Sequence, residues 1–168
     1  MILGVDLGQH VGWFLGNATG ELRYGTFDLE NTTDLGRWLR SADPLWQDLF
    51  GSGLVTGIAV EQPFMGRDYY PIRKLISLLG AMNYWASFYG ISAKNIVEIP
   101  IATGKKALSG KGNADGPMMI AAAKRVYGLD LTEHEAHAAG IHNVYLFGKA
   151  EDPPKARSRS SKGVSVKP

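Results

Sequence analysis

Two acidic residues, Asp6 and Glu61, stand at the ends of short apolar runs that are typical of buried strands. Asp6 ends the run MILGVD, and Glu61 ends the run GIAVE. A single carboxylate in such a place is usually a turn former or a solvated side chain. Two carboxylates at the ends of adjacent strands, however, would meet at one edge of a sheet, where they could share a hard divalent cation. Together the pair therefore indicates a metal site.

A third candidate group lies in the segment EHEAH, residues 133–137. On a helix, His134 and His137 are three positions apart and face the same side, and Glu133 and His137, four apart, do so as well. Imidazole and carboxylate groups at this spacing can bind a metal ion. The ordinary alternative is an exposed polar helix start, where acidic residues suit the helix dipole. His10 and His142 are expected to be ordinary surface or packing histidines.

The elements that must position these residues alternate between strand and helix patterns. The predicted order is a three-strand meander followed by helix, strand, helix, strand and two helices, a mixed α/β layout with helices on both faces of the sheet. The expected strands are 1–6, 10–15, 22–27, 57–61 and 95–99, and the expected helices are 33–50 with a break or a fresh start at Pro44, 71–89, 117–127 and 132–147.

Two local patterns add detail near the end of the chain. Residues 104–116 are rich in glycine and lysine and poor in apolar residues, so they predict a loop. Thr132 and Glu135, three residues apart, predict a capping box at the start of the last helix.

The composition fits one domain, residues 1–148, and a basic, disordered tail, residues 149–168. The chain has 168 residues, of which 45% are hydrophobic, so it can build a core. It has no cysteine, and no apolar run reaches the roughly 18 residues of a membrane span, so we expect a soluble cytoplasmic protein without disulfides. The tail holds six basic and two acidic residues, which leaves the body at about −2 within a net charge of +2. This asymmetry is compatible with nucleic-acid binding.

At these residues the chain resembles the RuvC-type Holliday-junction resolvases, nucleases with an RNase H-like fold. ILGVDLGQHVGW resembles the family's opening strand, which ends in Asp before a Gly-rich turn. IAVEQPF resembles the second motif, whose Glu binds metal. ATGKKALSGKGNADG resembles the family's Lys- and Gly-rich loop, and HEAHAAGIHNVY resembles the motif that opens the last helix. The four segments keep the family's order, and the short chain with its unusual final motif suggests a phage-encoded relative, which would act in the host cytoplasm.

The resemblance implies the metal ligands residue by residue. Asp6 and Glu61 match metal-binding carboxylates directly. His134 and His137 stand where the family has two acidic residues, which leaves the number and kind of metal ions open. Glu133 is the better substitute ligand, because Glu135 points about 100° away from His134 on a helix.

The resemblance also implies the residues that meet DNA. Phe64 matches an aromatic residue that inserts into the junction, although taken alone it would be predicted as a core residue. A lysine of the Gly-rich segment would offset the charge that grows on the scissile phosphate, and Lys106 is the catalytic candidate. The predicted DNA contacts are Phe64, Arg67, Lys105, Lys106 and Lys111.

The resulting hypothesis is an endonuclease that hydrolyses branched DNA with one or two Mg²⁺ or Mn²⁺ ions per subunit. The resemblance implies a homodimer through the helix 71–89, whereas the residues alone fit plain packing of that helix on the sheet equally well. Two other classes stay open. GVDLG also resembles the first phosphate loop of actin-like nucleotide-binding proteins, although those folds usually need two such domains. A non-catalytic junction-binding protein would keep the basic segments without cleaving DNA.

Overall fold

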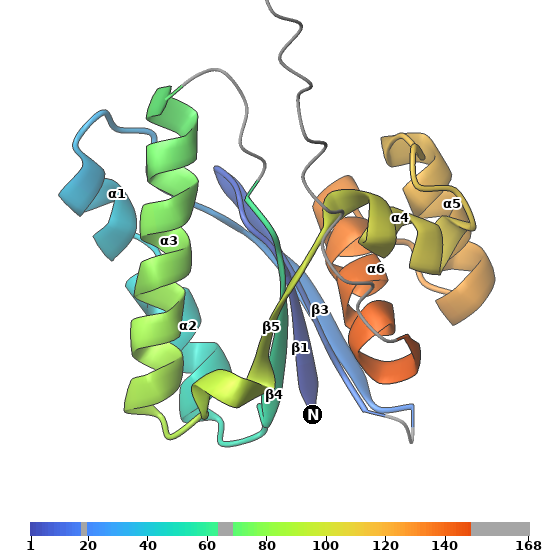
Figure 1. Cartoon of the computed structure of the whole chain (residues 1–168), viewed down its shortest axis with the longest axis horizontal. Helices are drawn as coiled ribbons and strands as arrows, with labels where there is room; N and C mark the ends of the chain where they lie inside the picture. Colours follow the sequence, from blue (N-terminus) through green and yellow to red (C-terminus); the bar gives the residue numbers. More distant parts are fainter. Residues whose placement is uncertain (18–19, 64–68, 149–168) are drawn as a thin grey trace, which may run out of the picture.

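A five-stranded mixed sheet lies at the centre of the computed structural model, which describes residues 1–17, 20–63 and 69–148 (Figure 1). The strands are β1 (Ile2–Asp6), β2 (His10–Gly16), β3 (Leu22–Asp28), β4 (Gly57–Glu61) and β5 (Ile96–Ile99), in the order β3-β2-β1-β4-β5. The first three form the predicted antiparallel meander, and β4 and β5 run parallel to β1. The strand pattern expected from the sequence is therefore confirmed.

Helices cover both faces of this sheet, as predicted (Figure 1). One face carries α1 (Leu35–Arg40), α2 (Asp43–Gly51) and α3 (Tyr69–Phe88). The other face carries α4 (Ile101–Ser109), α5 (Gly116–Tyr127) and α6 (Glu133–Phe147). A short 3₁₀ helix, η1 (Ala93–Asn95), leads into β5, so the strand begins one residue later than expected.

The fresh helix start expected at Pro44 is confirmed, whereas the loop expected over 104–116 needs correction. The segment 33–50 forms two helices, and the break lies at Ser41 and Ala42, so that Pro44 occupies the first turn of α2, where its missing N–H costs nothing. The loop expected over 104–116 is wrong for its first part, because α4 extends to Ser109. Gly104 is a packing residue there: a Cβ at this position would press on Ile141 of α6.

The contact between α6 and the sheet is unusually close. A Cβ on Gly4 of β1 would overlap the carbonyl oxygen of Ala138, and a Cβ on Gly12 of β2 would overlap that of His134. Glycine at these two strand positions lets the backbone of α6 lie directly on β1 and β2. The helix side of the contact is equally small, since Ala136, Ala138, Ala139 and Gly140 are all buried.

The opposite face of the sheet has a conventional core of large side chains. Trp38 and Trp46 are almost completely buried there, and Leu78 and Met82 of α3 pack into the same cluster as Leu3 and Val5 of β1. The interior side of α3 therefore packs on the sheet, as the residues alone allowed. Within the described ranges, no helix is long and apolar enough to cross a membrane.

His142 of α6 is a buried packing histidine, in agreement with the sequence expectation. Its side chain is 2% exposed, and its ring meets the edge of Phe14 at a centroid distance of 5.1 Å. Burial lowers the pKa of this ring, and the neighbouring Gly16 backbone opposes part of that effect.

We expect His142 to make the fold sensitive to acid. The folded-state pKa lies below the ordinary value of 6.5, so above pH 6.5 this histidine adds no pH dependence to the free energy of unfolding. Below pH 6.5 the unfolded chain binds a proton that the folded chain does not. Stability should fall as pH drops from 6.5, with a slope approaching about 1.4 kcal/mol per pH unit for one proton. Urea unfolding from pH 5 to 7.5 measures this slope, which should be shallower in His142→Gln. Equal slopes in the two proteins would contradict the assignment.

Candidate metal centre

The two strand-end carboxylates lie side by side at one edge of the sheet. Asp6 ends β1 and Glu61 ends β4, and these strands are parallel neighbours with Val5 paired to Val60. The predicted meeting of the two carboxylates is thus confirmed by the strand order. Asp6 is only 7% exposed, so its charge sits at the border of the interior.

His137 of α6 completes a group of three metal-binding side chains. One ligand atom from each of Asp6, Glu61 and His137 lies within 4.8 Å of the others. His137 Nε2 is buried and has no hydrogen-bond partner among the described residues, and the other ring nitrogen, Nδ1, lies 3.8 Å from Asp6 Oδ2. Burial lowers the pKa of this ring and favours the neutral form that binds metal. The donor set of two carboxylates and one imidazole fits a divalent cation such as Mg²⁺ or Mn²⁺.

His134 lies on the same side of α6 as His137, as the helical spacing predicts. Its Nδ1 is 3.0 Å from Asp6 Oδ2, and Nδ1 of His137 is 3.8 Å from the same oxygen. The hydrogen bond to Asp6 raises the pKa of His134, while burial opposes the rise. The side chain of His134 is 40% exposed, so it forms the solvent side of the centre.

Ionisation of Glu61 is unfavourable when no cation is bound. Its pKa is raised to about 8, first by burial and then by the negative charge of Asp6, and the ammonium of Lys105 opposes the rise. Two neighbouring carboxylates repel each other when both are ionised, and a divalent cation bound by both relieves that repulsion. This electrostatic cost is the second observation that fits the group to a metal ion.

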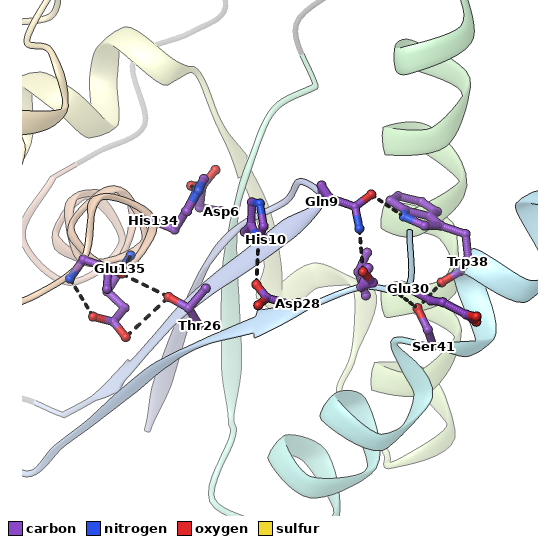
Figure 2. Close-up of polar contacts among 12 residues, drawn as sticks. Asp6, Gln9, His10, Thr26, Asp28, Glu30, Trp38, Ser41, His134 and Glu135 are labelled. Atoms are coloured by element: carbon purple, nitrogen blue, oxygen red, sulfur yellow. Dashed lines mark hydrogen bonds and ion pairs between the residues drawn. The ribbon is translucent and has the colours of Figure 1, made fainter. Parts of the chain in front are cut away.

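The start of α6 carries the predicted capping box, and Thr26 of β3 holds the same two residues (Figure 2). The Thr132 N–H donates to Glu135 Oε2 at 2.7 Å, and the Glu135 N–H donates to Thr132 Oγ1 at 3.3 Å. Thr26 Oγ1 of β3 lies 3.0 Å from Thr132 Oγ1 and donates to Glu135 Oε1 at 3.4 Å. Glu135 is therefore committed to the cap, while His134 and His137 face the metal centre.

The other predicted residues fall in different places. Glu133 packs against Gly116 of α5, where a Cβ would overlap its carboxylate, and it is not part of the three-residue group. Lys105 lies beside Glu61 and His137, whereas Lys106 lines a separate pocket with Phe147.

The remaining predicted DNA contacts are Lys111, Phe64 and Arg67. Lys111 is exposed just after α4. Phe64 and Arg67 lie outside the described residues, as does the tail 149–168.

His10, expected from the sequence to be an ordinary surface or packing histidine, is exposed at this same edge of the sheet. This residue begins β2, is paired in register with Asp28 at the end of β3, and its Nδ1 lies 2.6 Å from Asp28 Oδ1 (Figure 2). Its ring centroid is 5.5 Å from that of His134. The available signal was topological: in a meander, the start of the second strand and the end of the third share the edge at which the first strand ends.

No protein-family model matches this sequence, and no curated protein matches it. Solved structures do. The chain is similar to Thermus thermophilus RuvC, with a TM-score of 0.65, 19% identity, and coverage of 84% of this chain and 90% of that one. It is also similar to T. thermophilus RuvC in complex with a Holliday junction substrate, with a TM-score of 0.68, 18% identity and the same coverage. The chain thus has the RNase H-like fold of RuvC, which confirms the predicted fold class.

Replacing Glu61 with Gln should stabilise the metal-free protein. Because the folded-state pKa is about 8 and the ordinary value is 4.5, this group makes the fold less stable as pH rises from about 4.5 to 8. At pH 8 with EDTA, Glu61→Gln should raise Tm by roughly 2–5 °C, since 1 kcal/mol corresponds to about 2–4 °C in a domain of this size. Glu98→Gln, at an exposed position of β5, is the matched control and should leave Tm unchanged. A lower Tm for Glu61→Gln would contradict the electrostatic argument.

Proposed function

We propose that this chain is a metal-dependent endonuclease that hydrolyses phosphodiester bonds in branched DNA, including four-way junctions. The observation that carries the proposal is the grouping of Asp6, Glu61 and His137 at the sheet edge of a chain with the RuvC fold. A nuclease of this kind needs a divalent cation held by a few fixed ligands next to the DNA backbone. This sheet edge offers such ligands with a half-exposed imidazole, His134, beside them.

Each residue of the centre has a separate task in this proposal. Asp6 and Glu61 supply the negative charge that binds a divalent cation, and His137 adds a neutral nitrogen from the buried side. Such a cation would supply Lewis acidity toward the scissile phosphate and the attacking water. His134 orients the Asp6 carboxylate through its 3.0 Å hydrogen bond and is a further candidate ligand. Glu133 stays the substitute ligand.

Lys105 is the residue placed to balance charge on the reacting phosphate. Its ammonium is close enough to Glu61 and His137 to alter the pKa of both groups. A positive charge in that position would stabilise the oxygens on which negative charge grows during hydrolysis. Lys106 and Lys111, together with Phe64 and Arg67, are proposed to contact the DNA away from the scissile bond.

A homodimer through α3 is part of the proposal. The outer side of this helix exposes Ile76, Tyr84 and Phe88 by 48%, 65% and 67%, at positions that share one helical face. Large apolar side chains gathered on an exposed helix are typical of an interface. A two-fold dimer would present two metal centres to two strands of a junction, and the RuvC structure with its Holliday junction substrate supports the choice of substrate.

The proposal is tested by incubating the protein with a four-way junction and a sequence-matched linear duplex, with Mg²⁺, with Mn²⁺ and with EDTA. We expect cleavage of the junction alone, dependent on the metal, and faster with Mn²⁺ because imidazole ligands favour softer ions than Mg²⁺. Asp6→Asn should abolish cleavage while keeping junction binding, since affinity for the backbone comes from Lys and Arg. Binding without cleavage by the parent protein would support the non-catalytic alternative, and ATP binding would support the actin-like one.

Lys105 and Lys106 offer a matched pair for the charge-balancing role. The two lysines are adjacent in α4, but only Lys105 lies beside the carboxylates. Lys105→Ala should lower kcat by about 10²-fold, the usual effect of removing one group that stabilises transition-state charge. Lys106→Ala should lower kcat much less and act mainly on junction affinity. Single-turnover rates at saturating protein compare the two variants, and the reverse ranking would assign the catalytic role to Lys106.

A further inference from the structure

We propose that His10 and His134 form a second, nitrogen-rich cation site next to the Asp6–Glu61–His137 group, with Asp28 orienting His10. The contact between His10 and Asp28 lies at the surface, since their side chains are 53% and 75% exposed. Yet both belong to the same sheet edge as Asp6, and Figure 2 shows His10 beside the Asp6–His134 pair with Asp28 on its other side. Asp28 thus holds the exposed His10 ring next to the metal centre.

The two histidines are held in the same manner. His10 Nδ1 lies 2.6 Å from Asp28 Oδ1, and His134 Nδ1 lies 3.0 Å from Asp6 Oδ2. An ionised carboxylate only accepts hydrogen bonds, so each neutral ring carries its hydrogen on Nδ1 and offers a lone pair at Nε2. Metal-binding histidines almost always donate their other ring N–H to a carboxylate or carbonyl. The pairs Asp28–His10 and Asp6–His134 both have this arrangement.

The separation of the rings suits one shared ion. The centroids of His10 and His134 are 5.5 Å apart, and the ring planes differ by 37°. With a metal–nitrogen distance of about 2.0–2.1 Å and roughly 1.1 Å from nitrogen to ring centre, two imidazoles on a tetrahedral ion have centroids about 5–5.5 Å apart. Both side chains are partly exposed, so the rings can turn toward a common ion and water can complete its coordination.

The chemistry of this pair selects a different ion from that of the neighbouring group. Two imidazoles favour Zn²⁺, Co²⁺ or Ni²⁺ over Mg²⁺, whereas Asp6 and Glu61 provide the oxygen ligands that Mg²⁺ and Mn²⁺ prefer. The ion would lie on the β2 side of Asp6, within the same edge of the sheet. Its task there, binding a phosphate oxygen of the DNA beside the scissile bond, rests on the proposed endonuclease function.

Zinc binding to the full-length protein tests the site without any DNA. Isothermal titration with ZnCl₂ at pH 7.5 should detect a site whose affinity falls at least about 10-fold in His10→Ala, and about 10- to 100-fold in Asp28→Asn, the usual effect of removing a carboxylate behind a metal-binding histidine. Asp130→Asn removes a comparable exposed ion pair, with Lys124, and should leave zinc affinity unchanged. Circular dichroism checks that the variants fold. If His10→Ala does not fold, Asp28→Asn still tests the site.

The location of the ion is tested by NMR of the imidazole nitrogens. Zn²⁺ should shift the Nε2 signals of His10 and His134 together, and should still do so in Glu61→Gln, which weakens the neighbouring group. Zinc affinity unchanged in His10→Ala, or a His10 Nε2 signal that does not move, would overturn the site. Neither measurement involves cleavage, so the two proposals can fail separately. If the parent protein cuts no junction but binds zinc more tightly than His10→Ala does, the zinc site is upheld and the endonuclease is refuted.

Discussion

The direct contact of α6 with β1 and β2 is the constraint on which the rest of this structure depends. Gly4 and Gly12 remove the layer of side chains that normally separates a helix from a sheet, and the small residues of α6 use the space so gained. The first turns of the helix therefore lie at the height of the strand ends. At that height His134 and His137 reach the Asp6 carboxylate, which a helix resting on a full side-chain layer would hold farther away.

Electrostatics then explains why this tight packing leads to a binding site and not simply to a core. Asp6 and Glu61 are pressed together at the border of the interior, and burial together with their mutual repulsion opposes ionisation of Glu61. Lys105 offsets only part of that cost. A cation bound by both carboxylates would neutralise the pair in place of a proton. This edge of the sheet therefore favours the binding of positive charge.

The sequence could predict the parts of this arrangement that depend on local periodicity. The strand ends at Asp6 and Glu61, the shared face of His134 and His137, and the capping box all follow from spacings of two to four residues. It could not predict which lysine of α4 faces the carboxylates, because the glycine-rich segment gave no helical pattern from which to read a face. Glycines that serve close packing, such as Gly104, look the same in sequence as glycines that break a helix.

The pairing of His10 with Asp28 could be predicted only in part: the meander brings both residues to the edge where β1 ends, but their contact depends on the register of β2 against β3. By the resemblance to RuvC-type resolvases, His134 and His137 stand where those enzymes are expected to have two acidic residues. The helical spacing of three is kept, so the geometry of the edge survives the change, but two negative charges are lost. A site with less charge attracts a cation less strongly, and nitrogen ligands recover affinity only for ions that favour them. Asp28 returns one negative charge to this edge without entering the three-residue group, acting through His10. The antiparallel pairing of the meander brings Asp28 to the same end of the sheet as Asp6. Asp28 thus supplies part of the negative charge that His134 and His137 do not provide.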